Sequence, residues 1–131
     1  VIVRVPLASG LLTGTLSPET EFPENDHRNY NREGEAFDVG ETFAGVPYEV
    51  GLDAVEALRE HVPADLSLAQ FSLRWILDHE VVSTVIPGST TPEHIRANAG
   101  VSDVDPLGDD AHEAVETVYK KYVREHVHHR W

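Results

Sequence analysis

The sequence predicts an α/β fold with a parallel sheet, and three observations support this prediction. β-Branched apolar runs at residues 1–5 and 81–86 are typical of buried strands. Segments with helical apolar spacing lie between and after these runs, and a turn of small or hydroxyl residues directly follows each run. Strands that alternate with helices form βαβ units with right-handed crossovers, so we expect the two strands to lie parallel.

Two strands are too few for such a sheet to stand alone. Parallel sheets are buried on both faces, and both predicted strands are continuous apolar runs of the kind that need this cover. A two-stranded sheet would also leave both edges open. The 131-residue chain opens inside a strand and contains no methionine. We therefore expect the C-terminal part of a larger α/β domain, or a truncated gene product.

Two loops follow the first strand. Residues 6–14, PLASGLLTG, are mostly small or apolar and contain two glycines. Residues 15–47 show little periodicity and are polar, acidic and interrupted by proline and glycine. Because loops of this length are usually functional lids or disordered segments, we interpret residues 15–47 as one long loop of this kind.

Two helices should precede the second strand. Apolar spacing predicts a helix over residues 51–62, ended by Pro63. Within residues 65–80, Ser67 and Gln70 fit a capping box that starts another helix. The apolar residues of this second helix cover most of its circumference, which indicates burial on more than one side.

Two more helices should follow the second strand. Thr91 is a good N-cap for a helix over residues 92–99, which Gly100 closes. Apolar spacing predicts a last helix from about residue 109 to 126. Residues 124–131, REHVHHRW, form a histidine-rich C-terminal tail that is either flexible or docked.

The charge of the chain excludes some partners. Asp and Glu number 23 against 10 Lys and Arg, for a formal net charge of −13. Such a surface repels DNA and RNA, so nucleic-acid binding is disfavoured. One interpretation is an ordinary acidic protein. We favour adaptation to high salt, because the only lysines are Lys120 and Lys121 and salt screens self-repulsion. A melting temperature that does not rise in molar salt would contradict this.

The composition also bears on compartment. The chain has no cysteine, so disulfides and thiolate metal sites are excluded. No apolar run approaches the roughly 18–20 residues of a membrane span. The first residues lack the pattern of a signal peptide. The sequence therefore favours a cytoplasmic protein with no membrane partner.

The turn behind the second strand is one candidate site. Pro87 and Gly88 turn the chain, and Ser89 and Thr90 are then free to present hydroxyl groups. The following helix N-terminus carries unpaired N–H groups that attract anions, and His94 in its first turn can add a donor. The alternative is a well-capped helix that binds no ligand.

The loop behind the first strand has the same character. Pro6 fixes the turn, Ser9 and Gly10 let a ligand approach the backbone closely, and Leu7 and Leu12 offer apolar contact. The alternative is an ordinary tight loop. Because ligands bind at the C-terminal ends of parallel strands, two such junctions in consecutive units favour a nucleotide site.

Four segments carry a family resemblance over nearly the whole chain: PLASGLLTG, FPENDHR, LSLAQFSLRWILDHEVVSTVIPGSTTPEHIRAN and VHHRW. They resemble aldo-keto reductases, in particular one bacterial and archaeal branch of that family. The family is a TIM (β/α)8 barrel that uses NADPH, or sometimes NADH, to reduce aldehydes and ketones. The resemblance implies that this chain supplies the last two βα units of the barrel, the C-terminal helix and the tail.

The resemblance also implies cofactor contacts. Leu7 and Ser9 would lie along the pyrophosphate, with Pro6, Gly10 and Leu12 beside them. The residues implied to surround the adenosine 2′-phosphate and adenine are Gly88, Ser89, Thr90, His94 and Asn98, next to Pro87. Many family members carry Lys at the position of Gly88 and Arg at that of His94. NADP is therefore the implied cofactor with weakened charge contacts, and NAD is the alternative.

The catalytic residues of the family do not map onto this chain. The Asp, Tyr, Lys and His tetrad of the family comes from earlier barrel strands. The adjacent residues 119–122, YKKY, fit solvated lysines and packing tyrosines. His126, His128 and His129 have no second ligand cluster at metal spacing, so we assign no metal. We assign no catalytic residue within these 131 residues.

The implied function is that of the cofactor-binding part of an NADP-dependent oxidoreductase. In the complete enzyme, hydride would pass between NADPH and a small aldehyde or ketone, with upstream barrel strands or a second chain completing the fold. Two alternatives stay open. One is an inactive truncated or subunit-type nucleotide-binding protein, and the other is a different phosphate-binding TIM-barrel enzyme.

Overall fold

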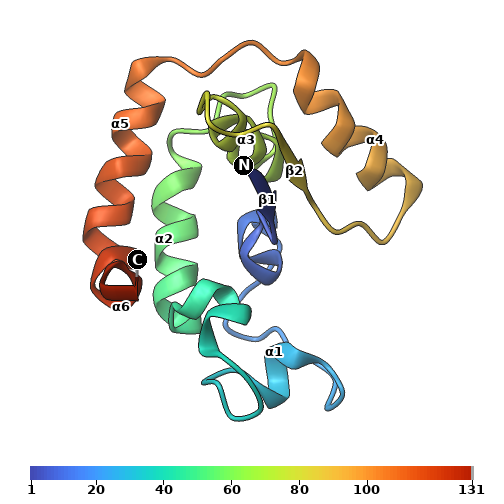
Figure 1. Ribbon diagram of the computed structural model, residues 1–131, viewed down its shortest axis with the longest axis vertical. Helices are drawn as coiled ribbons and strands as arrows, with labels where there is room; N and C mark the ends of the chain where they lie inside the picture. The colour runs from blue at the N-terminus through green and yellow to red at the C-terminus, as the bar shows by residue number, and fades with distance from the viewer. Residues whose placement is uncertain (131) are drawn as a thin grey trace.

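The two predicted strands pair in parallel. The computed structural model describes residues 1–130, and in it β1 (Ile2–Arg4) lies beside β2 (Thr84–Ile86), with Arg4 opposite Ile86 (Figure 1). Both strands are shorter than the predicted runs. Val5 leaves the extended conformation with φ of 49°, and Val82 N–H donates to the carbonyl of His79 in a turn (2.8 Å).

Helices make up most of the rest of the chain. In order they are η1 (Ala8–Thr13), α1 (His27–Tyr30), η2 (Val39–Glu41), η3 (Phe43–Gly45), α2 (Tyr48–Arg59), α3 (Leu68–Leu77), α4 (Pro92–Gly100), η4 (Val101–Asp103), α5 (Asp109–Val118), η5 (Tyr119–Val123), α6 (Arg124–Val127) and η6 (His128–Arg130). Those labelled η are 3₁₀ helices, except η5, which is a π-helix. No helix of residues 1–130 is both long and apolar enough to cross a membrane.

The helix α3 starts as predicted. Gln70 N–H donates to Ser67 Oγ (3.2 Å), and Ser67 N–H donates to Gln70 Oε1 (3.0 Å), which together form the capping box. The helix contacts η1 on one side and β2, α4 and η4 on others. Phe71 and Leu73 are accordingly 1% and 0% exposed, so the prediction of burial on more than one side is confirmed.

The other helix boundaries differ in part from the prediction. The helix α2 begins at Tyr48 and ends at Arg59, before Pro63 is reached. Thr91 caps α4 as predicted, because its Oγ1 accepts from the N–H of His94 (3.3 Å). Gly100 does not close α4 with a left-handed turn, since its φ is −62° and η4 follows directly.

The last helical run is longer than predicted. The chain stays helical from Asp109 through α5, η5, α6 and η6 to Arg130. The described residues 124–130 of the predicted tail are thus helical, and Val127 among them is 5% exposed. Burial of this apolar residue gives the last turns a reason to remain helical, since it anchors them to the body.

The segment 15–47 holds only α1, η2 and η3 and is organised around one buried amide. Asn31 and Thr42 are both fully buried. Asn31 Nδ2 donates to Thr42 Oγ1 (3.1 Å), and Asn31 Oδ1 accepts from the N–H groups of Ala36 (2.9 Å) and Phe37 (2.8 Å). These bonds replace the regular backbone ladder that the segment lacks.

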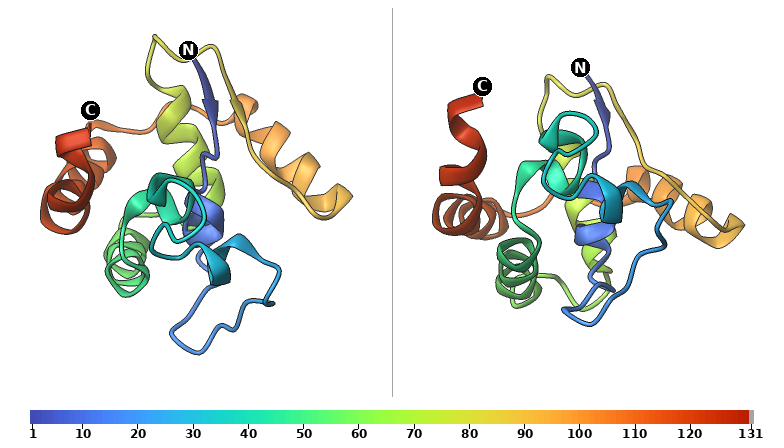
Figure 2. Two further views of the ribbon diagram at one scale, coloured as in Figure 1. Left: turned by 60° about the horizontal axis from the view of Figure 1, so that its bottom comes forward. Right: turned by 90° about the horizontal axis from the view of Figure 1, so that it is seen from below.

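The core lies to one side of the sheet. It is built from η1, η3, α2, α3 and α5, whose buried residues include Leu11, Phe43 and Val118. In Figures 1 and 2, α2 and α5 lie side by side on one side of β1, and α4 lies on the other. One face of the sheet stays exposed, with Ile2 64% and Ile86 59% exposed, whereas Val3 and Val85 are half-buried and α3 contacts β2. This α-rich arrangement with a small parallel sheet is consistent with a partial barrel.

Candidate functional site

The register of the sheet brings the two predicted junctions to one end. Because Arg4 lies opposite Ile86 in a parallel pair, residues 6–14 and 87–91 follow the strands at the same end of the sheet, the carboxyl end. We call these segments, with the side chains that contact them, the first and second junctions. No hydrogen bond joins the two junctions within residues 1–130.

The backbone of the first junction is strained. Val5, Ala8 and Ser9 have φ of 49°, 48° and 56°, and Gly10 follows with φ of 97°. The left-handed region costs a non-glycine residue about 1–3 kcal/mol, and more for a β-branched residue such as Val5. Strain of this kind persists where surrounding contacts impose it and is concentrated at ligand sites.

The Ser9 side chain ties the first junction to the segment 15–47. Its Oγ accepts from the N–H of Phe43 (3.1 Å) and lies 3.4 Å from Nε2 of His27. Both atoms within reach of the Ser9 hydroxyl proton are distant, since the carbonyl of Glu41 lies at 3.5 Å and Nε2 of His27 at 3.4 Å. The Ser9 hydroxyl could therefore donate its hydrogen bond to a better-placed acceptor, such as a ligand oxygen, at little cost.

A guanidinium that we did not select from the sequence lies at the same junction. Arg28 Nη1 donates to the carbonyl of Ser9 (3.4 Å). Asp26 holds the guanidinium in a fork, with Nε–Oδ1 of 3.0 Å and Nη2–Oδ2 of 2.7 Å, and the Phe22 ring lies 4.5 Å from its Cζ. These bonds lower the pKa of Asp26 to about 2 and raise the pKa of Arg28. The motif FPENDHR drew attention to this stretch, but its spacing from Ser9 gave no sign of contact.

The carboxylates at the first junction are neutralised. Glu41 accepts from both terminal nitrogens of Arg4 at 3.0 Å. These hydrogen bonds, more than the charge attraction, lower the pKa of Glu41 and raise that of Arg4. With Asp26 paired to Arg28 as well, the junction presents fewer free negative charges than the overall composition suggests.

The second junction is more open. Asn98 Nδ2 donates to Ser89 Oγ (3.1 Å), and Thr90 Oγ1 lies 3.4 Å from His94 Nδ1. The predicted residues at this junction thus form two side-chain pairs at the N-terminus of α4. Gly88 is exposed, and a Cβ built there meets no atom within 4 Å. The structure therefore leaves open space around Gly88, next to the two side-chain pairs.

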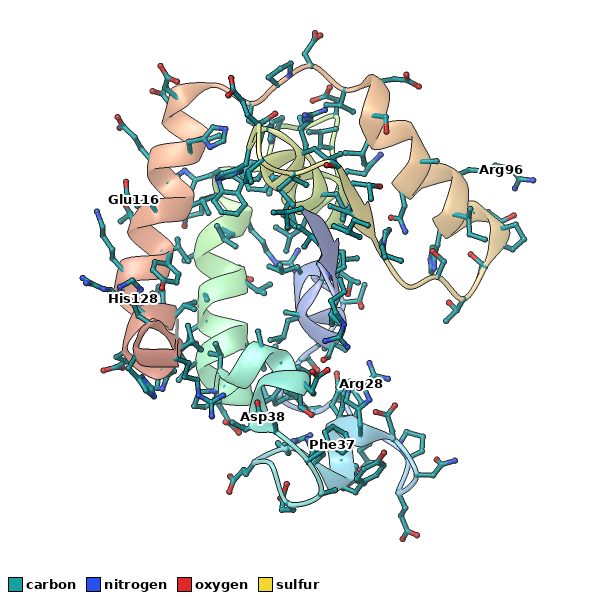
Figure 3. All side chains as sticks on the ribbon, in the orientation of Figure 1. Arg28, Phe37, Asp38, Arg96, Glu116 and His128 are labelled. Carbon is teal, nitrogen blue, oxygen red and sulfur yellow. The ribbon has the colours of Figure 1, made fainter. Side chains whose placement is uncertain are left out.

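Neither Arg96 nor Arg28 places a positive charge at the second junction. Arg96 lies 3.7 Å from the carboxylate of Glu93, and both side chains are more than three-quarters exposed. Figure 3 shows Arg96 pointing outward from α4, while Arg28 lies near η1 on the other junction. Arg96 therefore gives no sign of replacing the Arg that many family members carry at His94.

The polar residues of the last helical run are engaged with one another. Lys120 Nζ lies 2.6 Å from Glu116, Tyr119 OH lies 2.9 Å from Nδ1 of His128, and Lys121 lies over the ring of Tyr122. None of these contacts involves the two junctions. Residues 1–130 also contain no group of three histidine or acidic side chains placed to hold a metal ion.

Comparisons with known proteins agree with the resemblance. A family model described as Aldo/keto reductase family matches residues 1–120. Among solved structures, glycerol dehydrogenase AKR11B4 from Gluconobacter oxydans aligns with a TM-score of 0.68 and 24% identity, over 93% of this chain and 34% of that one. The apo form of aldo-keto reductase AKR11C1 from Bacillus halodurans aligns with a TM-score of 0.53 and 25% identity, over 89% of this chain and 33% of that one.

The extent of these matches decides what they show. The chain spans about a third of the length of each of the two solved structures. A comparison with curated protein sequences found no significant match. The family model covers all but the last 11 of the 131 residues, including both strands and both junctions. The chain therefore belongs to the aldo/keto reductase family.

Proposed function

We propose that this chain is the cofactor-binding C-terminal part of an NADP-dependent aldo-keto reductase. When bound, NADPH would supply a hydride to the carbonyl carbon of an aldehyde or ketone, and a proton would complete the alcohol. The observation that supports the proposal best is the parallel register of β1 and β2, because it puts both hydroxyl-bearing junctions at the carboxyl end of the sheet.

The first junction would hold the pyrophosphate. Ser9 offers a hydroxyl whose present acceptor is distant, and Arg28 offers a guanidinium that Asp26 keeps in place. Pro6, Leu7, Gly10 and Leu12 would shape the backbone and apolar wall beside it. Since Arg4 and Arg28 neutralise the nearby carboxylates, an anion can approach despite the net charge of −13.

The second junction would hold the adenosine 2′-phosphate. Ser89 and Thr90 present hydroxyls, and Asn98 and His94 already orient them. The donor chemistry fits a phosphate, while the missing cation at Gly88 weakens the preference for NADP over NAD. Pro87 would set the turn that leads into these residues.

A charge reversal at Ser89 tests the proposal. Ser89→Asp puts a carboxylate where the 2′-phosphate would lie, so the affinity for NADPH should fall at least tenfold. Ser102→Asp adds the same charge beyond the other end of α4, and we expect it to bind NADPH as the parent chain does. Titration followed by NADPH fluorescence gives both affinities. Equal affinities for the two variants would refute the assignment.

Chemistry would require residues outside this chain. The family tetrad does not map onto these 131 residues, so we expect NADPH binding without carbonyl reduction when this chain is assayed by itself. Turnover by this chain would contradict that part of the proposal. We place the complete enzyme in the cytoplasm, with NADPH and a small carbonyl compound as its partners.

A nucleotide-binding subunit without its own chemistry is the second candidate. The exposed Ile2 and Ile86 on both strands favour it, because they offer a sheet that another polypeptide could complete. Light scattering of the chain with NADPH present distinguishes a self-assembled species from a monomer. No observation favours a different phosphate-binding barrel enzyme now that the family is known.

A further inference from the structure

An imidazole lies beside the Ser9 hydroxyl at the first junction. It belongs to His27, the first residue of α1. Nε2 of His27 lies 3.4 Å from Ser9 Oγ, and Nδ1 lies 3.6 Å from Oδ1 of Asp26. The His27 side chain is 39% exposed, so it can exchange protons with solvent. Because imidazoles gain or lose a proton near neutral pH, this side chain can change the charge of the first junction.

The protonation state of His27 decides what the Ser9 hydroxyl can offer to a ligand. A hydroxyl has one O–H donor and two acceptor lone pairs. The N–H of Phe43 already donates to one lone pair (3.1 Å). A protonated His27 would donate from Nε2 to the other, which leaves the Ser9 O–H to donate to a ligand. A neutral His27 with its proton on Nδ1 would instead accept from Ser9 and compete with the ligand for that hydrogen bond.

The charged groups that surround His27 are already paired. They form three ion pairs: Asp26 with Arg28, Glu41 with Arg4, and Asp38 with Arg130. Hydrogen bonds from the arginines hold the pKa of Asp26 at about 2 and lower the pKa of Glu41. Both carboxylates therefore stay ionised above about pH 5 and do not titrate together with an imidazole. A proton gained by His27 thus adds net positive charge at this junction.

We propose that His27 is a proton-linked residue of the pyrophosphate site, which holds the cofactor more tightly when the imidazole is protonated. This inference rests on the proposed function, because it requires the pyrophosphate to lie at Ser9. Protonation acts in two ways, since it places a cation beside the phosphates and directs the Ser9 O–H toward them. The affinity for NADPH should therefore fall as the pH rises through about 6.5, where imidazoles titrate.

A substitution that removes the titration tests the proposal. His27→Gln keeps a side chain that can donate toward Ser9 but has no proton to lose. NADPH fluorescence gives affinities at roughly pH 6 and pH 8, and the parent should lose roughly fivefold more affinity over this range than the variant. The control is His61→Gln, because His61 lies between α2 and α5 and contacts neither junction; it should behave as the parent. Titration of the adenosine 2′-phosphate and of His94 is common to all three proteins and cancels in the comparison.

A second measurement uses the parent chain alone. If NADPH prefers protonated His27, linkage requires NADPH to favour protonation of His27 by the same factor. The pH midpoint of the His27 ring signals in NMR spectra should therefore rise by about 0.7 of a pH unit when NADPH is bound, which is the same fivefold change. The spectrum of His27→Gln identifies these signals.

The outcomes separate this inference from the proposed function. If NADPH binds while the parent and His27→Gln lose affinity equally between the two pH values, the role of His27 is wrong and the cofactor assignment stands. A midpoint that does not move when NADPH binds has the same meaning. If NADPH binds to none of the three proteins, the proposed function fails and the role of His27 fails with it.

Discussion

The first and second junctions occupy the same end of the sheet but are built in different ways. At the first junction, Ser9 is held by Phe43 and Arg28, which lie 34 and 19 residues further along the chain. At the second junction, the side-chain contact with the largest separation in the sequence is that of Asn98 with Ser89, which are only nine residues apart. The first junction therefore depends on the packing of the whole chain, and the second depends on the start of one helix.

Because of this difference, substitutions at the two junctions should affect folding stability and ligand binding to different extents. A Cβ at Gly51 would lie 2.7 Å from Leu11, which shows how closely α2 packs on the first junction. A substitution at the first junction, or at the residues that hold it such as Arg28, should change the free energy of unfolding as well as any ligand contact. A substitution at the exposed second junction should change ligand contacts and leave folding nearly unaffected.

The largest expected effect comes from the buried amide that organises the segment 15–47. Asn31→Ala would leave the Thr42 hydroxyl and the N–H groups of Ala36 and Phe37 without their partner. We expect a loss of about 3 kcal/mol in the free energy of unfolding, because several buried polar groups become unsatisfied. Urea denaturation followed by circular dichroism measures it.

The matched control lies at the second junction. Asn98→Ala removes a single bond to the exposed hydroxyl of Ser89. It should change the free energy of unfolding by no more than about 0.5 kcal/mol. Equal losses for the Asn98 and Asn31 variants would show that the segment 15–47, from which Phe43 N–H holds Ser9, depends no more on buried contacts than the second junction does.

A smaller effect should appear in acid. Hydrogen bonds from Arg28 lower the pKa of Asp26 from 3.8 to about 2 in the folded chain. A carboxyl with a lowered folded pKa stabilises the fold above its unfolded pKa, and this contribution is lost as the pH falls through the folded value. We therefore expect about 2 kcal/mol of stability to disappear between roughly pH 4 and pH 2.

Asp26→Asn isolates this contribution. Asparagine can still accept from the N–H of Arg28 at the start of α1, so the helix cap is retained while the charge is lost. The difference in unfolding free energy between the parent and this variant should shrink as the pH falls from 4 to 2. Glu93→Gln, whose pair with Arg96 is exposed, should show no such trend. A constant difference for the Asp26 variant would contradict the assignment.

Sequence reasoning succeeded where contacts are local and where a general rule of topology applies. The capping box of Ser67 and Gln70 and the Thr91 cap depend on residues three positions apart, so the pattern alone predicts them. The parallel pairing of the strands followed from the alternation of strands and helices. Two of the four segments used for the resemblance, PLASGLLTG and the one ending in IPGSTTPEHIRAN, contain the two junctions.

Sequence reasoning failed where residues far apart in the sequence determine the local conformation. The left-handed φ of Val5 shortens β1, and no propensity predicts such a conformation for a β-branched residue. Burial of Val127 extends the last helical run past the predicted end. The guanidinium of Arg28 reaches Ser9 only because the intervening segment folds back. Each of these outcomes depends on tertiary packing, which outweighs local preference.

The smallest expected effect would sharpen the role of the second junction. Gly88 has open space around its Cα, so Gly88→Lys should fold without strain and place an ammonium group beside Ser89. If the adenosine 2′-phosphate lies there, affinity for NADPH should rise roughly fivefold, which corresponds to about 1 kcal/mol for an exposed charge pair. Affinity for NADH, which lacks that phosphate, should not change.

The control for this variant is Gly108→Lys, since Gly108 at the start of α5 is equally open and the change in net charge is the same. A general relief of the repulsion between NADPH and a chain of charge −13 would raise affinity in both variants. A gain confined to Gly88→Lys and to NADPH, and reduced by added salt, is what a local phosphate contact requires. Should NADH gain as much as NADPH, the second junction would hold some other part of the cofactor, and the contrast drawn between the two junctions would concern packing alone.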